Sequence, residues 1–231
     1  MENMKNMKNM KKILLLTTLV ALVSVSAFAQ KGGFKKNTLS EGLGVTIPIG
    51  SWSTEGIGDG GYVSSGAQIS LNYQRSFSEG VGLSTSFNYG TFQATDGYLN
   101  DLLDITGCTS VNGKSPRYFN LGVGIFTSKE LGNSGFFIES DLQLIVGLFK
   151  DEELNFSGGS YSSYLNQYGS STNYFQIGAK IGASIYKMFG NFGVGLDLAE
   201  LYTTPKAENF SYASGGLIDY LTCQLKLVQK F

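Results

Sequence analysis

Residues 175–185 read FQIGAKIGASI, and this segment carries the pattern that decides the fold. Its odd positions hold Phe, Ile and Ala, whereas its even positions hold Gln, Gly, Lys and Ser. Successive side chains of a β-strand point to opposite faces, so this period of two predicts a strand with one apolar and one polar face. The same alternation recurs in seven other segments: residues 43–50, 67–74, 81–90, 119–125, 138–148, 192–199 and 221–231.

The connections between these eight segments alternate in length. In chain order they are residues 51–61, 75–80, 94–116, 129–135, 150–172, 187–191 and 203–216, so long and short connections take turns. An up-and-down meander places its odd connections at one end and its even ones at the other. Membrane-spanning barrels have short turns at one end and long loops at the other. We therefore predict an all-β fold, an eight-stranded antiparallel up-and-down transmembrane β-barrel, with residues 31–40 as a polar lead-in and no helix in the mature chain.

The N-terminal 29 residues have the composition of a signal peptide. Four Lys residues precede a short apolar run at residues 13–25, and Ala27-Phe28-Ala29 has small residues at the two positions that a signal peptidase reads. The apolar run is too short for a membrane anchor. The sequence thus predicts a signal peptide at 1–29 and a barrel domain at 30–231, beginning at Gln30.

Alternation alone does not say which face of the barrel meets lipid. The polar set consists mainly of Gly, Ser, Thr, Asn and Gln, which suits the narrow interior of an eight-stranded barrel better than a water-facing surface. Aromatic residues also gather near both strand ends, as they do at the two lipid–water interfaces. At the long-loop end these are Trp52, Tyr62, Phe92, Phe149, Tyr174, Tyr202 and Tyr220, and at the short-turn end Tyr73, Phe136, Phe137, Tyr186, Phe189, Phe192 and Phe231. We expect the apolar set to face lipid.

With these features, residues 40–231 resemble the small outer-membrane β-barrel family and are similar to OmpX and the membrane domain of OmpA. The signal-peptide region around Ala29 looks like those of Bacteroidetes-type bacteria. The resemblance implies the outer membrane of a Gram-negative bacterium, contact with outer-membrane lipid and lipopolysaccharide, and a monomer. It also implies that the terminal Phe231, following Leu225 and Leu227, is the signal that the barrel-assembly machinery reads.

The absence of His excludes several kinds of chemistry. With no His in 231 residues, Ser-His and Cys-His catalysis and His-ligated metals are ruled out. The 17 basic and 18 acidic side chains show no excess that would indicate nucleic acid. Cys108 and Cys223 are expected to be free thiols. We predict no enzyme activity, no cofactor and no metal. A divalent cation at Asp151-Glu152-Glu153 is an alternative to a solvated acidic run.

Two groups of residues are candidate functional sites. Five charged residues belong to the polar, inward set and are expected to form a paired network that closes the lumen: Glu139, Asp141, Lys180, Asp197 and Lys226. The third long loop carries Tyr161, Tyr164 and Tyr168 among Ser, Gly and Asn, a composition typical of adaptable binding loops.

The predicted function is therefore a structural or interaction role in the outer membrane, exerted through the long external loops, with an extracellular ligand as a candidate partner. The alternative is a narrow porin-like channel for small solutes. A soluble ligand-binding barrel and a lipid-modifying enzyme are further alternatives, and the missing His argues against the last.

Overall fold

The computed structural model describes residues 37–49, 63–78, 80–150, 153–168, 173–206 and 218–231, with the backbone alone at 97–98, 167–168 and 205–206. The predicted signal peptide lies outside these residues. Eight long strands make one closed antiparallel barrel in the order β1-β12-β11-β10-β8-β7-β4-β3. They are β1 (Asn37–Pro48), β3 (Gly66–Ser78), β4 (Val81–Thr91), β7 (Arg117–Glu130), β8 (Phe136–Lys150), β10 (Asn173–Phe189), β11 (Phe192–Lys206) and β12 (Ile218–Lys230). The predicted eight-stranded fold is confirmed.

The first and last strands close the barrel. β1 pairs with β12 from Thr38–Lys230 to Pro48–Tyr220, and Asn37 and Phe231 exchange two backbone hydrogen bonds of 3.1 and 3.0 Å. The expectation that residues 31–40 form a lead-in is therefore wrong for residues 37–40. Residues 37–40 are mostly polar, so the sequence pattern did not indicate a strand there. In the structure Thr38 and Ser40 point into the lumen, where polar residues are buried.

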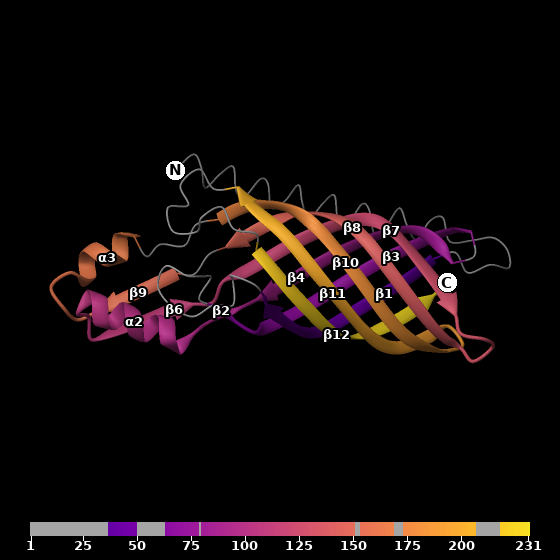
Figure 1. The fold of residues 1–231 in the computed structure, drawn as a ribbon, viewed down its shortest axis with the longest axis horizontal. Helices are drawn as coiled ribbons and strands as arrows, with labels where there is room; N and C mark the ends of the chain where they lie inside the picture. The colour runs from indigo at the N-terminus through magenta and orange to yellow at the C-terminus, as the bar shows by residue number, and fades with distance from the viewer. Residues whose placement is uncertain (1–36, 50–62, 79, 151–152, 169–172, 207–217) are drawn as a thin grey trace.

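The barrel is strongly staggered. A row of paired residues that starts at Ile177 in β10 and passes around all eight strands returns to β10 at Lys187, ten residues further along. Stagger and strand number together set the tilt and the radius of a barrel. The strands consequently cross the barrel obliquely (Figure 1).

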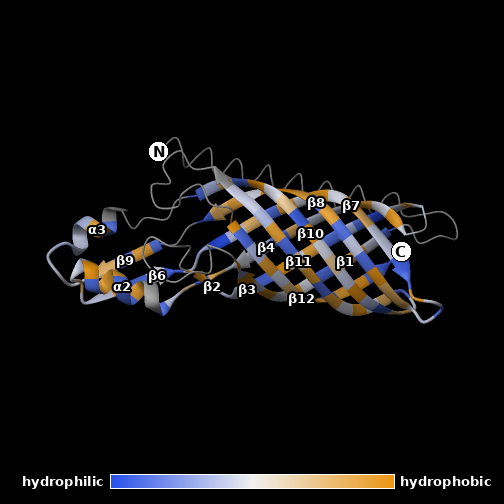
Figure 2. Cartoon of the chain, in the orientation of Figure 1, coloured by the Kyte–Doolittle hydropathy of each residue, from blue (hydrophilic) through white to orange (hydrophobic). Residues whose placement is uncertain are grey.

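The apolar set of every barrel strand faces outward, as the alternation predicted. Figure 2 shows hydrophobic and hydrophilic residues alternating along the barrel strands. Large apolar side chains on the outer wall are 50% to 70% exposed, among them Leu43, Ile69, Val123, Leu144, Ile181 and Leu225. The inward set includes Gln, Asn, Ser, Thr and charged side chains that are buried. The molecule is thus apolar outside and largely polar inside.

The two ends of the barrel differ. Three short connections lie at one end, beside the C-terminus, which we call the turn end (Figure 1). The opposite end, the loop end, carries additional structure: the two-stranded pairs β2 (Val63–Ser64) with β5 (Gln93–Ala94) and β6 (Ser110–Lys114) with β9 (Glu153–Ser157). The sorting of loops by length agrees with the predicted meander.

Helices in the long loops contradict the expectation that the mature chain has none. These are α2 (Asp96–Thr106) and α3 (Ser162–Tyr168). Leu99, Leu102 and Leu103 of α2 share one face, which packs on a small apolar cluster formed by Cys108, Val111 and Phe156. The helical spacing was present in the sequence but spans one short segment among many alternating ones. No helix in the described part of the chain is long and apolar enough to cross a membrane.

Candidate functional site

The best-defined polar contact inside the barrel joins Lys226 and Glu139. The Lys226 Nζ lies 2.7 Å from Glu139 Oε1, although their strands β12 and β8 are not neighbours, so the pair spans the lumen. Both side chains are buried. Lys226 Nζ also donates to Ser184 Oγ at 3.1 Å, and Gln74 Nε2 donates to the same Glu139 oxygen at 2.7 Å. Four strands are therefore joined through one buried carboxylate and one ammonium.

A second ion pair lies between adjacent strands. Lys180 Nζ of β10 is 3.2 Å from Asp141 Oδ2 of β8, and both side chains are buried. Asp197 of β11 differs, because no lysine or arginine nitrogen of the described residues lies within 4.0 Å of its carboxylate. The structure therefore brings four of the five lumen charges together as two pairs and leaves Asp197 outside both. Glu139, rather than Asp197, is the partner of Lys226.

Amide and hydroxyl groups form hydrogen bonds inside the barrel between these charges and the loop end. Ser86 Oγ donates to Gln143 Oε1, and Gln143 Nε2 donates to Ser84 Oγ at 3.1 Å. Further toward the loop end, Asn120 Nδ2 donates to the Tyr220 hydroxyl at 2.8 Å, and the Tyr118 hydroxyl donates to Gln68. Each contact joins two different strands, so hydrogen bonds between polar side chains connect the strands through the interior of the barrel.

A cluster of buried aromatic side chains, which we call the plug, lies inside the barrel toward the loop end. The Phe92 ring is fully buried and lies 5.6 and 5.4 Å, centroid to centroid, from the rings of Tyr118 and Tyr220. Phe149 is buried in the same cluster, with Val63, Ala199, Leu201 and Ile218 completing it. The backbone N–H of Phe92 donates a hydrogen bond to the Pro116 carbonyl oxygen, with an N···O distance of 2.9 Å. The plug thus combines ring packing with an anchored backbone.

The plug corrects the predicted aromatic belts. Phe92, Phe149 and Tyr220 lie inside the barrel instead of at the lipid interface, and so does Tyr186 near the turn end. Their positions continue the inward parity of their strands, which the sequence already indicated. Ile145, an apolar residue at an inward position of β8, is buried inside for the same reason. By contrast, Phe136, Phe189 and Phe192 are exposed on the outer wall at the turn end, as predicted. Trp52 and Tyr62 lie outside the described residues.

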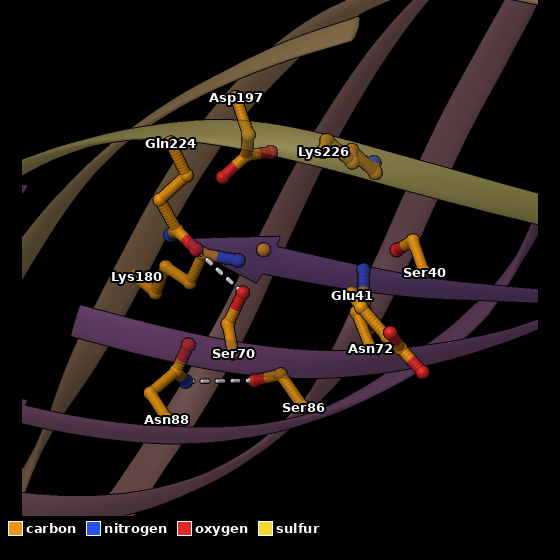
Figure 3. Close-up of a pocket in the computed structure, with 11 residues that line it drawn as sticks. Ser40, Glu41, Ser70, Asn72, Ser86, Asn88, Lys180, Asp197, Gln224 and Lys226 are labelled. Atoms are coloured by element: carbon orange, nitrogen blue, oxygen red, sulfur yellow. Dashed lines mark hydrogen bonds between the residues drawn. The ribbon is translucent and has the colours of Figure 1, made fainter. Parts of the chain in front are cut away.

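One small cavity lies inside the barrel among the described residues. The cavity in Figure 3 is lined by polar residues of β1, β3, β4, β10, β11 and β12, including Asn72, Asp197 and Gln224. The space open to the centre of a water molecule is about 10 Å³. A single water needs roughly that much. This cavity therefore has room for about one water molecule.

Outside the barrel, α2, β6, β9 and α3 form a unit that we call the lobe. Its apolar cluster of Cys108, Val111 and Phe156 is covered by leucines from both helices. The side chain of Asn166 in α3 both accepts from the Phe156 N–H at 2.6 Å and donates to the Phe156 carbonyl at 2.9 Å. These contacts give the long loops a core of their own beyond the barrel.

A surface ion pair lies on the β6–β9 pair of the lobe. Lys114 Nζ is 2.6 Å from Glu153 Oε1, and the hydrogen bond from Lys114 holds the pKa of the Glu153 carboxyl below its ordinary value. Glu153 belongs to the acidic run considered for a divalent cation, but Asp151 and Glu152 lie outside the described residues. Among the described residues no group of three or more Asp, Glu, Cys or His is placed to hold a metal ion.

The remaining candidate residues are placed as follows. Tyr161 and Tyr164 are 68% and 57% exposed on the lobe, whereas the side chain of Tyr168 lies outside the described residues. Phe231 lies on the outside of the turn end, tied by its backbone to Asn37. Its role as an assembly signal stays a prediction. Cys108 and Cys223 are free, as the sequence indicated, one in the lobe and one in β12.

Comparison with known proteins agrees with the fold. No protein-family model matches the chain, and no curated protein matches it in sequence. The crystal structure of Neisserial surface protein A has a TM-score of 0.50 at 8% identity, covering 87% of this chain and 100% of that one. The outer-membrane protein OprG of Pseudomonas aeruginosa has a TM-score of 0.50 at 13% identity, covering 85% and 96%. At such identities the likeness shows that the chain shares the barrel fold of these small outer-membrane proteins, and no more.

Proposed function

We propose that the protein is an integral outer-membrane β-barrel protein of a Gram-negative bacterium, exported by the signal peptide at 1–29. The observation that carries this proposal is the exposed apolar outer wall around a polar interior. A water-soluble protein rarely exposes apolar area on this scale, whereas lipid requires it. The closed strand order also leaves no backbone edge unpaired in the bilayer.

The barrel acts as a scaffold rather than as a pore. The aromatic plug, the two buried ion pairs and the single-water cavity support a closed lumen. A planar-bilayer recording of the purified protein tests this point. The scaffold role predicts no stable conductance, and a steady open channel would favour the narrow porin-like alternative.

The lobe is the surface through which the protein meets partners, with an extracellular ligand as the target class. Its own apolar cluster and its hydrogen bonds to Phe156 support this role, because they hold the exposed Tyr161 and Tyr164 on ordered structure. Tyrosine provides large contact area at low conformational cost. We propose no catalytic role, since the chain has no His to activate a nucleophile. Outer-membrane lipid, lipopolysaccharide and the barrel-assembly machinery are proposed as its partners within the envelope, and the barrel is proposed to be a monomer.

Complementation of a deletion strain tests the proposed role of the lobe. The strain receives either the wild-type chain or a variant in which short Gly-Ser linkers replace the lobe, and envelope permeability and surface binding are compared. Heat-modifiable gel mobility verifies that the variant barrel folds. We expect a folded variant that does not restore the wild-type behaviour. Full restoration by the variant without the lobe would assign the function to the barrel alone.

A further inference from the structure

One carboxylate of β1 lies on the outer wall of the barrel. Glu41 is exposed and has the outward parity of Leu43, which is 65% exposed. A Cβ atom placed on the next residue, Gly42, would meet the inward side chains of Gln224 and Ser70. Glu41 also borders the small cavity in Figure 3, but a side chain enclosed in so small a space would be buried. Its carboxylate therefore points away from the lumen.

Glu41 lies deep in the apolar band of the outer wall. It pairs with Leu71 of β3 and with Leu227 of β12. It belongs to the row of paired residues that winds from Ile177 near the loop end to Lys187 near the turn end, and it stands at the fifth of the eight steps of that row. The apolar band of such a barrel is about 25 Å tall, so the nearer interface is roughly 10 Å away in depth. A glutamate side chain is too short to reach water over that distance.

No described residue neutralises Glu41. No lysine or arginine nitrogen of the described part of the chain lies within 4.0 Å of its carboxylate, and no described donor makes a hydrogen bond to it. A charged side chain on the lipid face of a barrel is destabilising, and an ionisable residue inside the bilayer usually marks a functional site. The carboxylate is therefore paired in the membrane only if a donor outside this chain reaches it.

The outward charges of the barrel are sorted by strand. Three carboxylates face outward on β1, β12 and β11, which are consecutive in the barrel: Glu41, Asp219 and Glu200. Asp219 Oδ1 is buried and accepts no hydrogen bond from any described residue. The outward cations whose side chains are described lie on other strands, each within three residues of a strand end: Arg75, Arg117, Lys129, Lys150 and Lys187. The outer wall of β11, β12 and β1, which we call the acidic face, thus has no described outward cation of its own.

We propose that the acidic face docks another integral outer-membrane protein, which presents a lysine or arginine side chain to Glu41 inside the bilayer. Opposite charges across an interface select the partner and fix its register. Lipid hydrocarbon offers no positive charge at this depth. A second copy of this chain does not fit, because its described outward cations lie near strand ends and not at the depth of Glu41. The proposal rests on the membrane location proposed above and is independent of the role of the lobe.

Photo-crosslinking in the native outer membrane tests the acidic face. The full chain carries p-benzoylphenylalanine either in place of Leu43, beside Glu41, or in place of Leu144, which is 70% exposed on β8 at the opposite side of the barrel. We expect a discrete protein adduct from the Leu43 site and none from the Leu144 site, with the crosslink on a membrane-spanning segment that contains Lys or Arg. Glu41→Gln should lower the yield of this adduct about tenfold, the loss typical of a bond to a charged group. Asp101→Asn, on the exposed surface of α2, should not change the yield.

Three crosslinking results would overturn the proposal. These are adducts with lipid alone, an adduct between two copies of this chain, and a protein adduct whose yield Glu41→Gln leaves unchanged. Heat-modifiable gel mobility in the outer-membrane fraction verifies that each variant is folded and inserted. Absence of the wild-type chain from that fraction would overturn the proposed membrane location as well, so the two failures are distinguishable.

The stability of the purified barrel provides an independent measurement. Without the partner Glu41 faces lipid alone, so Glu41→Leu should raise the equilibrium constant for folding into phospholipid vesicles about tenfold in a urea titration. Asp101→Leu removes a carboxylate from the exposed surface of α2 and should leave this constant unchanged. A folding constant for Glu41→Leu equal to or below that of the wild type would show that the carboxylate is already satisfied in the isolated barrel, and would overturn the proposal.

Discussion

Replacing Lys226 by Met should destabilise the barrel strongly, because it leaves Glu139 buried without its cation. Both side chains of the pair are buried, at 5% and 3% exposure, and their charged atoms are 2.7 Å apart. Removing one partner of a buried ion pair typically costs about 3–5 kcal/mol. Gln74 still donates to Glu139 at 2.7 Å, and the Tyr186 hydroxyl lies 3.4 Å from its second oxygen. We therefore expect a loss near the lower limit, about 3 kcal/mol.

The assay is urea unfolding in phospholipid vesicles, followed by far-ultraviolet circular dichroism and by heat-modifiable gel mobility. The double variant Lys226→Met/Glu139→Gln should be less destabilised than Lys226→Met, because it removes both charges together. Lys114→Met is the matched control, since Lys114 makes an ion pair of nearly equal length, 2.6 Å, on the exposed lobe. Exposed pairs contribute little, so this control should not measurably shift the midpoint.

A loss below about 1 kcal/mol for Lys226→Met would refute the reasoning, because it would mean that water reaches Glu139 and that the pair behaves as an exposed one. A double variant as unstable as the single one would also contradict it. In that case the cost would come from lost packing around the long Lys226 side chain rather than from the stranded charge.

Three other perturbations have defined outcomes. Phe92→Ala should lower the free energy of unfolding by about 3–5 kcal/mol in the same urea titration, because it empties the centre of a buried ring cluster; a small loss would mean that the plug is loosely packed. Deletion of Phe231 should slow the appearance of the heat-modifiable form in cells more than it lowers the stability of the folded barrel, and a normal insertion rate would leave this residue without a role in assembly. Lys114 lowers the folded-state pKa of Glu153, so the bond stabilises the lobe above the unfolded pKa of Glu153 and is lost as the pH falls through the lowered value. Amide exchange in β6 and β9, corrected for intrinsic pH effects, should therefore speed up on acidification in the wild type, and an unchanged pH response in Lys114→Met would exclude this pair as the cause.

The sequence by itself determined the barrel, because side-chain alternation and loop length are local properties. A strand such as residues 175–185 must place Ile177 and Lys180 on opposite faces wherever it packs, and eight such segments with connections of alternating length allow few closed arrangements. The same parity identified Glu139, Asp141, Lys180, Asp197 and Lys226 as inward residues. The same parity also indicates that Phe92 and Tyr220 point inward. The general enrichment of aromatic residues at lipid–water interfaces instead suggested a place on the outer wall.

Only the tertiary structure decided which inward residues meet. The stagger of the barrel sets the relative heights of residues on different strands, and no single strand encodes it. Lys226 thus reaches Glu139 across the lumen instead of Asp197 on the adjacent strand, and Asp197 lines a cavity together with Asn72. The lobe could not be predicted for a related reason. The helix α2 is short, and its leucine face has a packing partner only when β6 and β9 pair, although these strands come from loops about 40 residues apart in the chain.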